Sequence, residues 1–299
     1  MNKTHLNTYN TKRNDYLSLF LIVLHISFIF APIYLSSLYQ DPWILVMSFF
    51  WFSLFSNGII NLMHESAHRL IFKKRTFCDF FGQWVLGPLL FTDFDSYRDR
   101  HWVHHNKFGT DEDTKETYLK KIKGKKLFLI FIECIFLKHA LIKFLKSIEH
   151  WQDKNFKSSK RVVIVQLFFF STLVLFNFFF ESDLKMILVR SFFSYSIIYI
   201  YGLASLGVFI SILRAIAEHQ VLESSPNIIG KGTLRNLKCN FLTGMIFGSY
   251  GFSEHATHHK YPSIPYYNLV VATDFFRREN KLLEYGSGYI QTLIQLCKR

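Results

Sequence analysis

Histidines recur along this chain at the spacing that places imidazoles on one face of a helix. Residues 64–68 read His-Glu-Ser-Ala-His, residues 101–105 read His-Trp-Val-His-His, and residues 255–259 read His-Ala-Thr-His-His. Side chains three and four positions apart are neighbours on a helix, and imidazole is a good ligand for iron, zinc or copper. The candidate metal ligands are His64, His68, His101, His104, His105, His219, His255, His258 and His259.

The number and pattern of these histidines indicate two metal ions, because eight or nine imidazoles exceed what one ion accepts. A single HxxxH pattern arises often by chance, so the weight rests on the two HxxHH patterns. His219 follows the last long apolar stretch, where the pair Glu218-His219 is costly without a partner, which favours a ligand. The remaining histidines, interpreted as structural or exposed, are His5, His25, His139 and His150.

Residues 64–68 also fit HExxH, the zinc metalloprotease pattern, in which Glu65 would act as the general base. That alternative leaves both HxxHH patterns without a role, so we treat it as distant. A protease would need only one further ligand for its zinc ion.

Apolar stretches around the histidines indicate the elements that position them. Membrane-spanning helices need roughly 20 mostly apolar residues, and four stretches qualify: 17–38, 42–63, 162–180 and 186–213. Residues 80–91 are too short to span and predict a re-entrant or interfacial segment. Residues 127–145 mix apolar residues with lysines, which favours an amphipathic helix on the membrane surface over a fifth span.

Composition and charge agree with a membrane protein. Half of the 299 residues are hydrophobic and the formal net charge is +13. The basic residues lie mostly beside the apolar stretches, which favours the membrane surface and not nucleic acid as their partner. Positive charge follows the second stretch and precedes the third, so we expect both termini and all the histidine stretches in the cytosol. The first stretch is too long for a signal peptide, and the four dispersed cysteines predict free thiols.

The three histidine stretches, in this order and with these gaps, resemble the membrane-bound fatty acid desaturase family, which includes hydroxylases and carotenoid ketolases. The flanking residues 105–113 and 258–269 are similar as well, and the resemblance covers about residues 57–269. We expect residues 1–299 to form a single domain of this kind, in which the resemblance is strongest over residues 57–269.

This resemblance implies an all-α integral membrane fold with four transmembrane helices, interfacial helices and a cytosolic helical cap that holds the histidines. It implies two irons held by the nine histidines named above, and O2-dependent attack on an unactivated C–H bond of a fatty acyl or lipid substrate. It also implies an external electron donor of the ferredoxin or cytochrome b5 type. Desaturase, hydroxylase and ketolase all stay open, as does a catalytically inactive membrane scaffold.

One position departs from part of that family. Some animal acyl-CoA desaturases have an Asn four residues before the histidine that corresponds to His219, whereas this chain has Ala215. The metal ligands are therefore expected to differ, with Glu218 or a water filling in. Metal-bound imidazoles usually donate their second N–H to a carboxylate or carbonyl, and the acids beside the candidate ligands are Glu65, Asp99, Asp111, Glu218 and Glu254.

Overall fold

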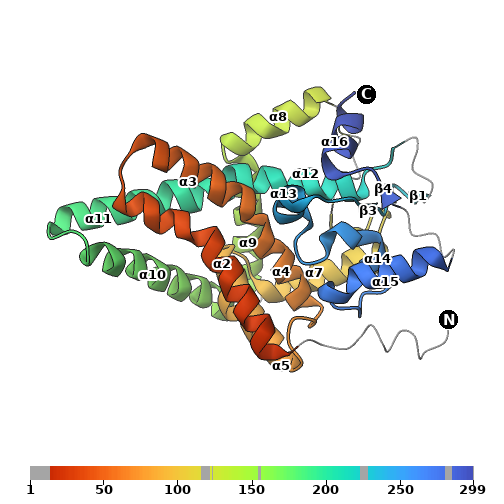
Figure 1. Ribbon diagram of the computed structural model, residues 1–299, viewed down its shortest axis with the longest axis horizontal. Coiled ribbons are helices and arrows are strands. Elements are labelled where there is room, and N and C mark those ends of the chain that lie inside the picture. The colour runs from red at the N-terminus through yellow and green to blue at the C-terminus, as the bar shows by residue number, and fades with distance from the viewer. Residues whose placement is uncertain are drawn as a thin grey trace.

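The computed structural model describes residues 14–115, 122, 124–153, 156–222, 228–279 and 285–298, with the side chains of all but 146–159 and 285. Within these ranges, four helical segments are long and apolar enough to cross a membrane: Asp15–Leu38, Pro42–Ala67, Lys160–Phe178 and Leu184–His219. They lie side by side in Figure 1, with shorter helices gathered at one end. The predictions of an all-α protein and of four membrane-spanning helices are confirmed.

The first two spans form a hairpin. Helix α2 (Asp15–Leu38) starts at Asn14, whose side chain accepts a hydrogen bond from the Tyr16 N–H. Helix α3 (Pro42–Phe55) starts at Asp41, which caps the Trp43 and Ile44 N–H groups. Such caps satisfy donors that have no partner inside the helix. The second span continues through α4 (Asn57–Ala67), so it carries the first histidine stretch itself.

The third and fourth spans form a second hairpin, made of α10 (Phe156–Phe178) and a long composite helix. That helix consists of α11 (Leu184–Phe193), the π-helical segments η3 (Ser194–Tyr201) and η4 (Leu203–Gly207), and α12 (Val208–His219). At 36 residues it is about 50 Å long, against a hydrocarbon core of roughly 30 Å. The helix is therefore longer than a span of the hydrocarbon core requires, and His219 is its last residue. The sequence predicted a shorter span because polar residues end the apolar window but not the helix.

Aromatic side chains fill the space between the spans. Phe30 of α2 contacts Phe52 of α3 edge to face, with ring centroids 5.5 Å apart, and Phe169 of α10 at 5.3 Å. The Tyr199 ring lies 4.9 Å from Phe169. Aromatic pairs of this geometry stabilise a core beyond the area that they bury. The two hairpins are thus joined along their lengths.

The segment predicted to be re-entrant or interfacial is a broken helix that packs against the spans. It comprises α5 (Arg75–Phe81), the π-helical η1 (Gly82–Leu86) and α6 (Gly87–Leu89). The Tyr199 hydroxyl donates to the Leu89 carbonyl at 2.7 Å, and the Gln166 side chain donates to the Pro88 carbonyl at 2.8 Å. Spans three and four therefore satisfy the carbonyls at the end of this short helix.

The remaining elements lie between and after the spans. Residues 127–145 form parts of two helices that turn at Leu137, which has a positive φ of 59°, and neither helix qualifies as a span among the described residues. The short strands pair as antiparallel β1–β2 and parallel β3–β4. The bounds of these elements are α7 Phe94–Lys107, α8 Gly124–Ile135, α9 Lys138–Asp153, β1 Ile228–Ile229, β2 Gly232–Thr233, β3 Asn236–Leu237, α13 Phe241–Thr243, η5 Gly244–Gly248, η6 Phe252–Glu254, α14 His255–Lys260, α15 Tyr266–Arg278, β4 Tyr285–Gly286 and α16 Tyr289–Cys297.

Candidate metal centre

Four helices meet at one end of the spans and bring the candidate ligands together. The first histidine stretch lies at the end of α4, the second on α7, and the third forms α14, while His219 ends α12. Both interspan turns, at Tyr39 to Asp41 and at Phe179 to Asp183, lie at the far end of the bundle in Figure 1. All the histidine stretches are thus on one side of the four spans.

Among the described residues, nine histidines form two groups with the geometry of a metal site. In each group, one ring nitrogen per histidine lies within 4.8 Å of the ring nitrogen offered by every other member. The five-histidine group consists of His64, His68, His101, His105 and His258, and the four-histidine group of His104, His219, His255 and His259.

Ring nitrogens in the five-histidine group point at one another. His68 Nε2 lies 2.7 Å from His101 Nε2 and 3.1 Å from His258 Nε2. His105 Nε2 lies 3.1 Å from His101 Nε2. The His64 ring is 4.3 Å from the His101 ring, measured between centroids.

The four-histidine group is built in the same way. His219 Nε2 and His255 Nε2 are 3.1 Å apart. The His104 ring lies 5.1 Å from the His219 ring and 4.9 Å from the His259 ring. His259 is partly exposed, whereas the other three are buried.

Each HxxHH stretch is divided between the two groups. His101 and His105, four residues apart on α7, belong to the five-histidine group, whereas His104 between them belongs to the other. On α14 the roles are reversed, because the pair His255 and His259 joins the four-histidine group and His258 joins the five. The sequence predicted one face for each stretch. The structure places the i and i+4 members around one point and the i+3 member around a second point.

Burial keeps these imidazoles neutral, which is the form that binds a metal. Burial lowers the pKa of His68 to about 3. It lowers the pKa of His104 to about 4, although the Asp113 carboxylate opposes the shift. The same cause lowers the pKa values of His101, His255, His258 and His259 well below 6.5.

Carboxylates orient some of the rings from behind. His104 Nδ1 lies 2.9 Å from Asp113 Oδ1, and both side chains are fully buried. His64 Nδ1 lies 3.3 Å from Glu65 Oε1, while the other Glu65 oxygen accepts a hydrogen bond from the Tyr266 N–H. The Asp113 contact fixes which ring nitrogen of His104 faces the group, whereas Glu65 places a carboxylate beside His64 without a hydrogen bond to it.

The acids singled out in the sequence have different surroundings in the structure. Glu65, Glu218 and Glu254 are buried, whereas Asp99 and Asp111 are exposed, and Asp111 pairs with Lys231. The sequence analysis did not select Asp113. The acidic run 111–113, shortly after the second histidine stretch, was the sequence feature that could have indicated it. Which of these three acids contacts a histidine depends on how the loop folds back against α7.

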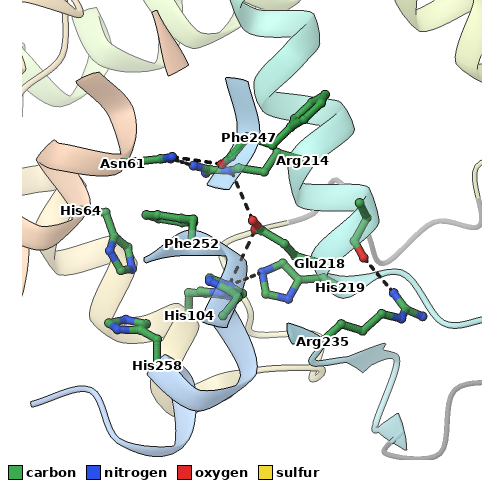
Figure 2. A network of polar contacts seen from close by, with 12 residues as sticks. Asn61, His64, His104, Arg214, Glu218, His219, Arg235, Phe247, Phe252 and His258 are labelled. Carbon is green, nitrogen blue, oxygen red and sulfur yellow. Dashed lines mark hydrogen bonds and ion pairs between the residues drawn. The ribbon is translucent and has the colours of Figure 1, made fainter. Parts of the chain in front are cut away.

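A buried arginine links the helices that carry the histidines, and the sequence analysis did not select it either. The Arg214 guanidinium donates to Asn61 Oδ1 and lies over the Phe252 ring at 4.2 Å (Figure 2). The Asn61 amide donates to the Phe247 carbonyl at 3.0 Å and to the Ser249 carbonyl at 3.1 Å. This network connects α4, α12 and the loop that leads into α14. A charged residue inside an apolar span was the signal that pointed to it.

The end of α12 is held by a second arginine. Arg235 donates to the Ala217 carbonyl at 3.0 Å and to the Gln220 carbonyl at 2.6 Å. Carbonyls in the last turn of a helix have no partner within that helix, so Arg235 fixes the position of His219 between them.

The other histidines lie outside both groups where the structure describes them. His25 Nδ1 lies 2.7 Å from the Tyr250 hydroxyl, and His139 pairs with Glu133 on the surface. Their interpretation as structural or exposed fits these contacts. His5 and the His150 side chain lie outside the described part of the chain.

The fold and the two histidine groups define a membrane protein with a site able to hold two metal ions. A sequence profile of the fatty acid desaturase family matches residues 41–292, which include all nine histidines. The chain therefore belongs to the fatty acid desaturase family and is an oxidoreductase of the desaturase and hydroxylase type. Comparison with curated proteins and with solved structures gave no match.

Proposed function

We propose that the chain is a two-iron enzyme that desaturates the acyl chain of a fatty acid or lipid with O2. The observation that carries this proposal is the convergence of nine histidines, from four helices far apart in sequence, into a five-membered and a four-membered group. The whole chain, residues 1–299, is proposed to act as one domain, since the two groups draw ligands from spans two and four and from the elements between and after them.

The number of imidazoles in the five-histidine group fits iron better than zinc. With metal–nitrogen bonds of about 2.1 Å, ligands at right angles are about 3.0 Å apart, and ligands of a tetrahedron are about 3.4 Å apart. Three of the Nε2 separations in the five-histidine group are 2.7, 3.1 and 3.1 Å, and all five imidazoles lie around one point. Five imidazoles support a site of five or six ligands, whereas structural zinc is nearly always four-coordinate.

The overall reaction removes one hydrogen from each of two adjacent carbons and reduces O2 to two waters, with two electrons and two protons from outside. Iron bound by the nine histidines supplies the activation of O2 that protein side chains lack. The histidines serve as ligands. Asp113 orients His104 through Nδ1, the ring nitrogen that faces away from the four-histidine group.

The site is proposed to face the cytosol, together with both termini. Exposed basic residues that include Lys73, Lys74 and Arg75 follow span two on the side of the histidine groups. Such residues are retained on the cytosolic side of membranes, where they also attract anionic lipids. The same face is proposed to receive an acidic electron donor of the ferredoxin or cytochrome b5 type.

Lipid analysis of a bacterium that expresses the chain tests the activity. We expect a lipid about two mass units lighter than its precursor, and none in a strain that expresses a variant with His258→Ala and His259→Ala. The single variant His139→Ala is the matched control, since His139 lies outside both groups. A product about sixteen units heavier identifies a hydroxylase, and an unchanged lipid profile in every strain contradicts the proposal.

The electron donor is tested separately by measuring turnover of the purified enzyme with ferredoxin or cytochrome b5 across ionic strength. We expect the rate to fall as salt rises, because screening weakens docking between opposite charges. A rate that does not change with salt contradicts docking by charge.

The structure favours no other function. In a zinc protease of the HExxH type, His64 and His68 would need one further ligand and an open position, yet three more histidines surround them. A hydroxylase or ketolase would use the same site, so only the product separates it from a desaturase. A catalytically inactive scaffold would bind less than one iron per chain, which metal analysis of the purified protein measures.

A further inference from the structure

The two histidine groups differ in size, and a buried carboxylate lies beside the smaller one. The five-histidine group has a ligand more than the four-histidine group. Glu218 immediately precedes His219 at the end of α12 and is fully buried, with 0% of its side chain exposed. Two buried carboxylates contact this group: Asp113 at Nδ1 of His104, and Glu218, which approaches Nε2 of His255.

The two oxygens of Glu218 have different surroundings. Oε1 accepts a hydrogen bond of 2.9 Å from the Tyr289 hydroxyl and lies 3.7 Å from Arg214 Nε. Within the described part of the chain, Oε2 has no hydrogen-bond partner although it is buried. Buried carboxylate oxygens are rarely left in this way, because the lost hydration is not replaced. One oxygen is thus held in place while the other is left for a ligand.

The free oxygen points toward the four-histidine group. Oε2 lies 3.8 Å from His255 Nε2, which is itself 3.1 Å from His219 Nε2 (Figure 2 shows Glu218 and His219). Around a six-coordinate ion with bonds of about 2.1 Å, neighbouring ligands are about 3.0 Å apart and opposite ligands about 4.2 Å apart. The separation of 3.8 Å lies between these values.

We propose that Glu218 is a further ligand of the metal held by the four-histidine group, bound through Oε2, with Tyr289 and Arg214 holding Oε1. This inference rests on the proposed two-metal site. It gives each group five protein ligands, four imidazoles and a carboxylate in one and five imidazoles in the other. It also makes the two metals chemically different, because only one of them has an anionic protein ligand.

Cobalt titration of the purified, metal-free protein tests the role of Glu218 without any turnover. Visible absorption bands of Co²⁺ report how many ligands surround each ion, and equilibrium dialysis gives the two dissociation constants. In Glu218→Gln we expect the second cobalt to bind about tenfold or more weakly, with a changed spectrum for that ion alone. Glu65→Gln is the matched comparison, because Glu65 is a buried carboxylate beside the five-histidine group, and it should leave the Glu218-dependent ion unchanged.

Glu218→Asp is the second variant, used if Glu218→Gln does not fold. It keeps the negative charge and shortens the side chain by one methylene. We expect it to alter the spectrum of the same single cobalt ion. Two cobalt ions bound with wild-type affinity and wild-type spectra in the folded variants overturn the inference. Failure of the wild-type protein to bind two ions contradicts the proposed two-metal function instead, so the two results are distinguishable.

Discussion

The rings of His105 and His259 stack face to face, with centroids 4.1 Å apart and planes inclined by 15°. His105 belongs to the five-histidine group and His259 to the four-histidine group. This pair therefore joins the two candidate metal positions directly, through two ring systems contributed by α7 and α14. Both rings are also partly exposed, unlike the other seven, so the contact lies on the accessible side of the site.

Replacing either ring should remove one metal in preference to the other. We expect His105→Ala to weaken metal binding at the five-histidine group and His259→Ala to weaken it at the four-histidine group, each by about tenfold or more. Metal content per chain after dialysis measures the loss. His139→Ala should keep the wild-type metal content, since its partner is Glu133. Equal loss of both metals from either single variant would show that the two positions are not separate.

Asp113 should matter for metal binding although it is not a ligand. Its carboxylate lies 2.9 Å from His104 Nδ1 and fixes the ring with Nε2 toward the four-histidine group. Asp113→Asn keeps the size of the side chain and removes the charge. We expect metal affinity at that group to fall by about 10- to 100-fold, as measured by competition with a chelator. Wild-type affinity in the folded variant would contradict the orienting role.

Gly82 should not accept a side chain, because a Cβ there would lie 2.2 to 2.5 Å from ring atoms of Phe94, at the start of α7. We expect Gly82→Ala to destabilise the protein by about 1 to 3 kcal/mol. Gly244→Ala is the matched control, because a Cβ there would meet Cys239 Cβ at 3.7 Å, an ordinary contact. Thermal unfolding in detergent compares the two. A Gly82 variant as stable as the Gly244 variant would contradict the close packing of η1 against α7.

The stability of the metal-free protein should fall as the pH is lowered. His68 and His104 have pKa values of about 3 and about 4 in the folded protein, below the ordinary value of 6.5 that they regain on unfolding. Between about pH 6.5 and pH 4 the unfolded chain therefore binds more protons than the folded one, so protons favour unfolding in that interval.

The melting temperature of metal-free protein, measured from pH 8 to pH 4 in one detergent, checks this expectation. We expect little change above about pH 6.5 and a drop of several degrees below it. Replacement of His104 by Gln should reduce the drop, because one of the shifted groups is then absent. A melting temperature that stays constant down to pH 4 would contradict the neutral, buried state of these rings.

Local features of the sequence were enough to predict the membrane class and the candidate ligands. Long apolar runs predict spans because an apolar helix satisfies its own backbone hydrogen bonds in lipid. The i, i+3 and i+4 spacing predicts shared helix faces because it depends only on the helical repeat. Neither inference requires knowledge of how the helices pack against one another. The four spans predicted from the apolar runs are present.

The tertiary structure alone decided how the histidines are divided. His104 and His105 are adjacent in sequence, yet they belong to different groups, because the partition depends on how α7 and α14 are oriented toward α4 and α12. The same holds for Arg214, which approaches its partner Asn61 from 153 residues further along the chain, and for Asp113, whose contact with His104 depends on how the loop after α7 folds back. Helical periodicity fixes the direction of a side chain from its own axis, whereas the packing of separate helices determines which side chains meet.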